Sequence, residues 1–133
     1  MNLYYNTSDQ IFFKNSYNTS TYSGMDTLYY GDLLPVSLSL YETSGSQYIT
    51  SAFDGTATCI FSLGDTDYNQ YTSSTLTAGA NSYNGNFEVT GSLMEADLTI
   101  GSGSISSIFQ LKKTTGNYVE TLFQNSIVIL KTI

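Results

Sequence analysis

The sequence contains no histidine, no tryptophan and no arginine, and it has one cysteine and one proline among its 133 residues. Histidine is the most frequent proton-transfer group in catalysis, and arginine is the usual clamp for phosphate and carboxylate groups. The single Cys59 cannot form a disulfide within the chain. We therefore expect a non-enzymatic binding or assembly module, without catalytic residues and without a cofactor.

Charge is scarce too, since charged residues make up 11% of the chain against about 25% in typical soluble domains. Eleven acidic residues and four lysines give a net charge of −7. So acidic a protein is repelled by phosphate backbones and by anionic membrane surfaces, and we expect neither nucleic acid nor a membrane as partner.

No segment approaches the roughly 18 apolar residues of a membrane span, and residues 1–5 lack the features of a signal peptide. We therefore expect synthesis in a cytoplasm, and export as part of an assembly if the protein acts outside a cell.

Tyrosine and small polar residues are abundant: 12 tyrosines and 11 glycines stand among many Ser, Thr and Asn residues, and 41% of the chain is hydrophobic. This length supports one core without disulfides or metal. We expect a single domain over residues 1–133, in which residues 1–30 form an aromatic N-terminal hairpin or arm and residues 31–133 form the core.

Apolar residues recur at every second position in several segments, which is typical of strands with one buried face. Cys59, Phe61 and Leu63 are the clearest example. In the first thirty residues, two aromatic clusters flank a polar turn, and this spacing predicts a hairpin. The expected strands cover residues 33–42, 48–52, 58–63, 87–93, 104–112, 118–123 and 126–131.

Three other segments have different patterns. Residues 65–83 are polar and predict a long connection with one edge strand near 74–77. Residues 94–100 have helical spacing, with Leu93, Ala96, Leu98 and Ile100 on one side, and predict a short helical turn. Residues 15–26 predict an exposed loop.

Eight or so short strands at regular intervals predict an all-β fold, an antiparallel β-sandwich with one short helical turn. Few charges and one proline leave its edges prone to association unless another chain pairs with them. The closing segment 126–131 is apolar on both faces, so it is either central or covered by a partner.

Four stretches resemble a family of small phage tail and baseplate modules, the immunoglobulin-like N-terminal domains of baseplate upper proteins and tail-fibre adaptors. They are NLYYNT at 2–7, YGDLLPVSL at 30–38, GTATCIFSL at 55–63, and the tail 105–130 with IFQL, ETLFQ and SIVI. In the second stretch, the family usually has Arg-Gly-Asp where this chain has Tyr30-Gly31-Asp32. The resemblance implies an immunoglobulin-like fold and a structural role in the virion, without catalytic motifs.

The partners that this resemblance implies are other virion proteins and copies of the chain itself. Protein interfaces depend on a few desolvated aromatic anchors, and the anchors that we expect are Leu3, Tyr4, Tyr5, Phe12 and Phe13. Two alternatives stay open. One is a capsid decoration (cement) protein, and the other is a carbohydrate-binding module that stacks a glycan on tyrosines such as Tyr4, Tyr5, Tyr17, Tyr22, Tyr29 and Tyr30.

The sequence gives little support for a catalytic, metal-binding or glycosylation site. Asp65/Asp67 and Glu95/Asp97 are the close carboxylate pairs, and solvated turn carboxylates are the simpler interpretation. Asp65, Asp67 and Asn69 alternate as in the first half of a calcium loop, but Gln70 stands where that loop needs Gly and Leu76 where it needs Glu. Cys59 is expected in the core. Glycosylation sequons begin at Asn6 and Asn18, and such triplets arise by chance in this composition.

Overall fold

The computed structural model describes residues 2–15, 18–21, 27–50 and 55–131. Its longest strands are Leu33–Ser44, Ser104–Thr115 and Tyr118–Lys131, and each covers a segment in which alternation predicts a strand. The strands are β1 (Asn2–Asn6), β2 (Ile11–Asn15), β3 (Asn18–Thr21), β4 (Thr27–Tyr30), β5 (Leu33–Ser44), β6 (Gln47–Thr50), β7 (Thr58–Gly64), β8 (Gln70–Ala78), β9 (Tyr83–Glu88), β10 (Ser104–Thr115) and β11 (Tyr118–Lys131), and the helix is α1 (Ser92–Ile100).

The strands follow one hydrogen-bonded path in the order β3-β2-β1-β5-β9-β8-β7-β10-β11-β4, and β6 pairs with β5. Most neighbours are antiparallel, but β1 pairs with β5, and β4 with β11, in parallel. The expectation of a mostly β protein with one short helix is confirmed. The sheet is mixed, however, and differs from the purely antiparallel immunoglobulin-like sandwich that we expected, because β1 and β4 pair with strands reached through longer connections.

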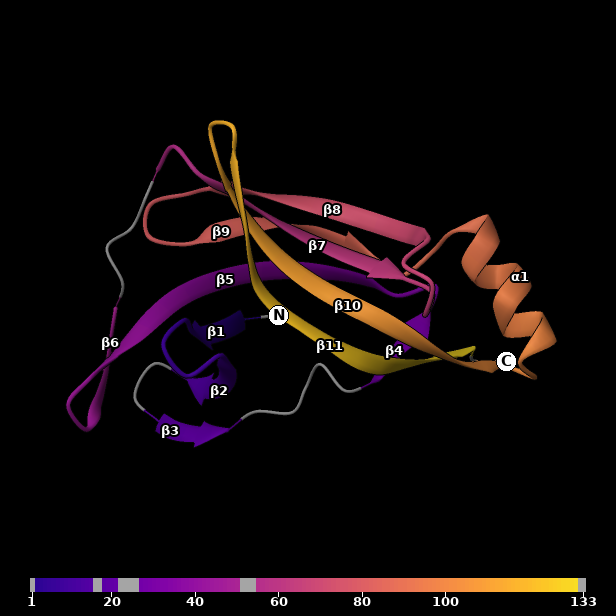
Figure 1. Cartoon of the computed structure of the whole chain (residues 1–133), viewed down its shortest axis with the longest axis horizontal. Helices are drawn as coiled ribbons and strands as arrows, with labels where there is room; N and C mark the ends of the chain where they lie inside the picture. The colour runs from indigo at the N-terminus through magenta and orange to yellow at the C-terminus, as the bar shows by residue number, and fades with distance from the viewer. Residues whose placement is uncertain (1, 16–17, 22–26, 51–54, 132–133) are drawn as a thin grey trace.

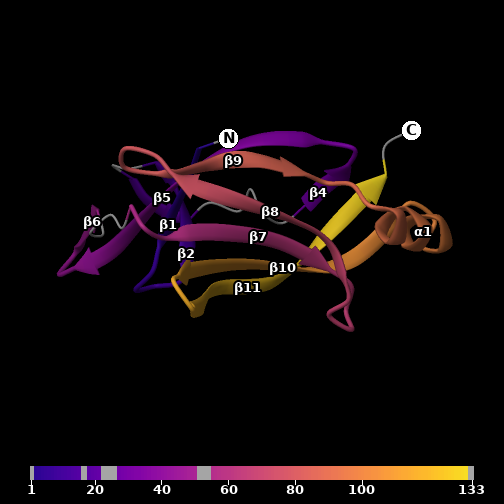
Figure 2. The ribbon, with the colours of Figure 1, turned by 90° about the horizontal axis from the view of Figure 1, so that it is seen from above.

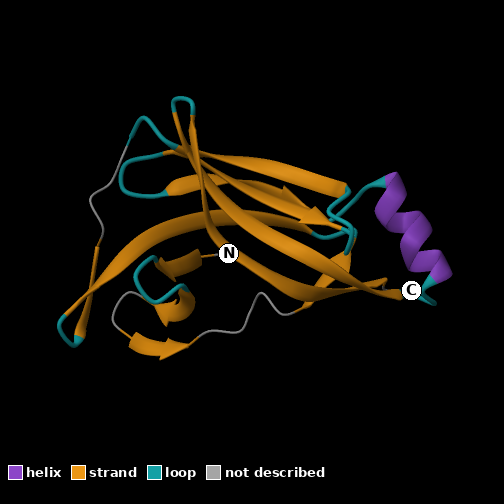
Figure 3. Ribbon diagram, viewed as in Figure 1, coloured by secondary structure: helices purple, strands orange, loops and turns teal. Residues whose placement is uncertain are grey.

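The sheet curls into a half-barrel with α1 at one end (Figures 1, 2 and 3). Strand β8 makes the bend, since its residues up to Leu76 pair with β7 while Thr77 and Ala78 pair with β9. Gly85 of β9 permits the close approach of these strands: a Cβ atom there would lie 2.9 Å from the carbonyl oxygen of Thr75. A side chain at this position would push β9 away from β8.

The concave side of the sheet holds the hydrophobic core. A continuous series of aromatic rings crosses it, with Phe61 and Phe109 at 5.2 Å, Phe109 and Phe123 at 6.1 Å, and Phe123 and Phe12 at 5.1 Å between ring centroids. Tyr5 joins this series through Phe12 at 4.8 Å. Rings from β1 and β2 thus pack against rings from β10 and β11, which lie far along the strand path, and this packing maintains the curl.

A second aromatic cluster covers the opposite face of the N-terminal hairpin. Phe13 is almost fully buried there, with its ring centroid 5.0 Å from both Tyr41 and Tyr48 and 5.7 Å from Tyr4. The hairpin predicted from the aromatic clusters is confirmed, with Tyr4 paired to Phe13 and Tyr5 to Phe12. Both of its faces are covered by other parts of the same chain.

Several segments differ from the sequence-based expectation. The expected strand at 87–93 is one of them, because β9 covers Tyr83–Glu88 and α1 begins at Ser92. The segment 70–78 is the internal strand β8 with a neighbour on each side, where we expected an edge strand. Strand β11 runs unbroken through residues 124 and 125, where we expected an interruption. The expected loop at 15–26 contains β3 in its described part. In α1, Met94 and Leu98 are buried while Leu93, Ala96 and Ile100 face solvent, so the buried side is not the expected one.

The described part of the chain contains no helix long and apolar enough to cross a membrane.

Candidate interaction surfaces

The expected interface anchors hold the chain itself together. Leu3, Tyr5, Phe12 and Phe13 are each at most 4% exposed, and Tyr4 is partly buried against Phe13. A partner could reach the four buried side chains only if the sheet opened. This corrects our expectation that the aromatic N-terminal segment forms a surface: alternation placed its residues on two faces, and both faces are covered within the chain.

Exposed apolar side chains gather at the end of the molecule that carries α1. Nine large apolar side chains are well exposed in the described part of the chain, and five of them lie on α1, on β4, at the start of β5 or near the end of β11. Ile100 is 83% exposed, the highest value in this group. We call this surface the helical end; its residues are Tyr29, Leu33, Leu93, Ile100 and Val128. Contiguous exposed apolar areas are typical of protein–protein contacts, so the helical end is the candidate surface for such a contact.

Polar contacts join α1 to the neighbouring strands at the helical end. Glu95 of α1 accepts a hydrogen bond from the Tyr30 hydroxyl at 3.3 Å and lies 4.0 Å from Lys131 Nζ. The Tyr71 hydroxyl donates to Asp97 Oδ2 at 2.7 Å. Burial first, and then Asp97, raise the pKa of Tyr71 far above its usual range. Glu95 and Asp97 thus fix α1 on the sheet, and this is a structural role.

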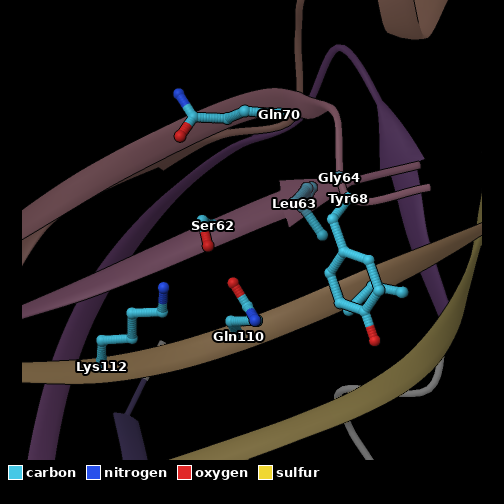
Figure 4. A pocket seen from close by; sticks show the side chains of 8 residues that line it. Ser62, Leu63, Gly64, Tyr68, Gln70, Gln110 and Lys112 are labelled. Atoms are coloured by element: carbon cyan, nitrogen blue, oxygen red, sulfur yellow. The ribbon is translucent and has the colours of Figure 1, made fainter. Parts of the chain in front are cut away.

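A different surface lies on the convex side of β8, β7, β10 and β11, where a hollow of about 290 Å³ opens beside Tyr68 (Figure 4). Gln110 Nε2 donates to Gln124 Oε1 at 2.7 Å, and Gln124 Nε2 donates to the Tyr68 hydroxyl at 3.2 Å. The Tyr68 ring is 64% exposed. The hollow is lined by Ser62, Leu63, Gly64, Tyr68, Gln70, Ile108, Gln110 and Lys112.

The loop before β8 positions this tyrosine. Tyr68 has a φ of 65°, a left-handed conformation that is uncommon for a residue with a side chain. Asp65 closes the loop, because its carboxylate accepts hydrogen bonds from the backbone amides of Asp67 at 2.9 Å and Asn69 at 2.8 Å, and from Asn69 Nδ2 at 2.9 Å. Hydrogen bonds from the Asn69 side chain and from both amides lower the pKa of Asp65.

The same contacts explain the calcium-like pattern in the sequence. The oxygens of Asp65 accept hydrogen bonds within the loop, so they cap the turn. Among the described residues, no group of three or more His, Cys, Asp or Glu side chains could hold a metal ion. Asp65, Asp67 and Asp97 line one shallow groove, and their known contacts are structural.

Two further sequence candidates are structural as well. Cys59 is a free, fully buried cysteine, and burial raises the pKa of its thiol to about 12 despite an opposing effect of Lys113. Asn6, the first sequon residue, is also fully buried. It accepts hydrogen bonds from the amides of Ser8 and Asp9 and donates one to Thr43 Oγ1. A glycan at Asn6 would displace these contacts.

The tyrosines proposed for a binding face are scattered. Tyr17 and Tyr22 lie outside the described residues. Tyr5 is buried, while Tyr29 is exposed at the helical end. Sequence reasoning missed Tyr68, although its position between Asp65 and Gln70 in a turn-rich segment marks an exposed loop. What the sequence did not show is the strand pairing that brings Gln110 and Gln124 next to it.

Comparisons with known proteins do not identify a family for this chain. No protein-family model matches the chain, and no curated protein matches it. Among solved structures, the N-terminal domain of phage TP901-1 ORF48 is similar, with 14% sequence identity over 99% of this chain and 97% of that chain and a TM-score of 0.36. A TM-score of this size does not establish a common fold.

Proposed function

We propose that this chain is a non-enzymatic structural protein of a phage particle, which acts by protein–protein assembly at the tail, the baseplate or the fibre attachment. The observation that supports this most is the helical end, where Leu93 and Ile100 of α1 are exposed while Met94 and Leu98 of the same helix are buried. An apolar helix face turned to solvent is costly unless a partner covers it. The sequence resemblance supports the virion as the place of assembly.

The surface chemistry supports an assembly role over catalysis. Among the described residues, no group of three or more His, Cys, Asp or Glu side chains could hold a metal ion, and Cys59 is buried, which raises the pKa of its thiol. The partners that we propose are other virion proteins and copies of the chain, and the net charge of −7 disfavours nucleic acid. Localisation in the virion follows from this proposal.

The proposal is tested by following the protein into particles. In the parent phage, replacing both Leu93 and Ile100 by Ser is expected to abolish incorporation while the isolated protein stays folded, because both side chains are exposed. The matched control replaces Tyr118 and Val119 by Ser at the β10–β11 hairpin tip, which lies away from α1 (Figure 1). Quantitative mass spectrometry of purified particles reads out both variants.

The number of copies per particle distinguishes a tail or baseplate protein from a capsid decoration protein. A small multiple of three or six copies per particle supports the tail or baseplate, whereas hundreds of copies would indicate capsid decoration. Absence of the wild-type protein from particles, or equal incorporation of the helical-end variant, would contradict the proposed assembly role.

A further inference from the structure

The convex face of β8, β7, β10 and β11 is unusually uniform in chemistry. Strand register places its outward residues in three rows across the four strands, and hydroxyl or amide side chains dominate. Lys112 is the one charged residue in these rows. The rows are Thr75, Ile60, Lys112 and Thr121; Ser73, Ser62, Gln110 and Gln124; and Gln70, Gly64, Ile108 and Ser126.

Tyr68 stands at the border of this face with its ring held in one orientation. The loop hydrogen bonds to Asp65 fix its backbone, and Gln124 fixes its hydroxyl. Gly64 lines the hollow beside Tyr68, and an added Cβ there would lie 3.0 Å from the carbonyl oxygen of Asn69. A ring held in place before binding loses little conformational entropy when a ligand stacks on it.

The hydrogen bonds that join Gln110, Gln124 and Tyr68 leave two polar atoms available to a ligand. Gln110 donates to Gln124, and Gln124 donates to Tyr68. Within the described part of the chain, no further hydrogen bond uses Gln110 Oε1 or the Tyr68 hydroxyl proton. One free acceptor and one free donor therefore border the hollow, and Ser62 and Lys112 lie on its other side (Figure 4).

We propose that this face is a saccharide-binding site, at which a pyranose ring stacks on Tyr68 and its hydroxyls exchange hydrogen bonds with Gln110, Ser62 and Lys112. The C–H face of a sugar ring is slightly positive and is attracted to the negative face of an aromatic ring. Sugar hydroxyls both donate and accept, as amides and hydroxyls do. Because Lys112 is the one charged side chain in these three rows, most of the face is neutral, and removing water from it costs less than removing water from a charged surface.

The site differs from the helical end and adds a function to the proposed assembly role. A particle protein with both surfaces would be fixed in the particle through one and would contact a glycan through the other. The hollow is shallow and at the small end of ligand sites, which are typically about 300–1,000 Å³. The hollow has room for one or two sugar rings. We therefore expect a single copy of the chain to bind a saccharide weakly.

The test is an NMR titration of the isotope-labelled full chain with methyl glycosides of glucose, galactose, N-acetylglucosamine and rhamnose, and with disaccharides of each. We expect at least one of these sugars to shift the side-chain amide signals of Gln110 and Gln124 in a saturable manner. Tyr68→Ala should weaken this binding by about tenfold or more, as expected for loss of a stacking partner. Tyr68→Phe keeps the ring but loses the hydrogen bond from Gln124, so its affinity should lie between those of the wild type and Tyr68→Ala.

Tyr118→Ala is the matched control, because Tyr118 is 65% exposed at the hairpin tip, and Tyr68 is 64% exposed. Circular dichroism checks that each variant is folded. The proposal is overturned if no sugar in the panel shifts the Gln110 and Gln124 signals, if binding survives in Tyr68→Ala, or if Tyr118→Ala weakens it equally. Tyr68→Ala should enter particles normally, so failure of this site and failure of the assembly role are distinguishable.

Discussion

The hydroxyl of Tyr5 on β1 donates a hydrogen bond to the backbone carbonyl of Leu122 on β11, 117 positions further along the sequence. These strands are separated along the strand path by β5, β9, β8, β7 and β10, so the bond spans the concave side of the curled sheet. Leu122 is the extra residue at the irregularity opposite Leu111 and Lys112. The bulge frees its carbonyl from the ladder to β10.

Removing this hydroxyl tests whether the bond stabilises the curl. Tyr5→Phe keeps the ring packing but leaves the carbonyl of Leu122 without its partner, and we expect a loss of about 1–3 kcal/mol in the free energy of unfolding. Urea denaturation measures it. Tyr118→Phe, at an exposed tyrosine, should change stability by less than about 0.5 kcal/mol. Equal stability of the two variants would show that the Tyr5 bond contributes nothing.

Replacing Phe12 tests whether the N-terminal aromatic residues stabilise the core or form an interface. It is 4% exposed and packs against Tyr5 and Phe123, so Phe12→Ala should destabilise the isolated chain by about 3–5 kcal/mol. Leu93→Ala, at an exposed apolar residue on α1, should cost little. If Phe12→Ala leaves the melting temperature unchanged but blocks assembly, Phe12 is a surface anchor after all.

Gly91 precedes α1 in a conformation that favours glycine, with φ at 145°. A Cβ atom there would also lie 2.8 Å from the carbonyl oxygen of Tyr71. We expect Gly91→Ala to cost more than the roughly 1–3 kcal/mol of backbone strain alone, measured by thermal unfolding. Gly31→Ala is the control, since Gly31 has a φ of 95° and no atom within 4 Å of the added Cβ. Equal costs would mean that the contact with Tyr71 is relieved by a small shift.

Asp65 makes the stability of the loop before β8 depend on pH. Hydrogen bonds from Asn69 and Asp67 lower its pKa in the folded chain, and in the unfolded chain an Asp titrates near about 3.9. The folded chain therefore binds this proton less readily, so the stabilisation is present above about pH 4 and is lost as pH falls through the lowered pKa.

We expect Asp65→Asn to flatten the fall in melting temperature between about pH 4 and pH 2. Asp67→Asn changes a neighbouring carboxylate that caps no amide in the described part of the chain, and it should keep the wild-type pH profile. Identical profiles for Asp65→Asn and the wild type would remove Asp65 as the pH-dependent group.

Local patterns predicted many elements well. Cys59, Phe61 and Leu63 alternate and are buried on β7 as expected, and the turn at Gly116 closes the β10–β11 hairpin. Such elements can be predicted from the sequence for two reasons. Apolar and polar residues must alternate in a strand with one buried face, and a two-residue turn needs residues that tolerate a positive φ. The position of α1 was also predicted, although its buried side was not.

Pairing between distant segments was not predictable. Strand β4 pairs in parallel with β11, and β1 with β5, yet nothing in the alternation of either strand specifies its neighbour. The candidate saccharide site depends on this level of structure, since Tyr68, Gln110 and Gln124 meet only through the register of β7, β10 and β11.

The sequence by itself determined that this is a β-rich chain, because period-two alternation specifies which side chains of a strand are buried. Only the tertiary structure decided which surface each residue reaches. It placed the N-terminal aromatic residues in the core and left Ile100 and Tyr68 exposed, because burial depends on which distant segment packs against a face, and long-range pairing is not encoded in local period.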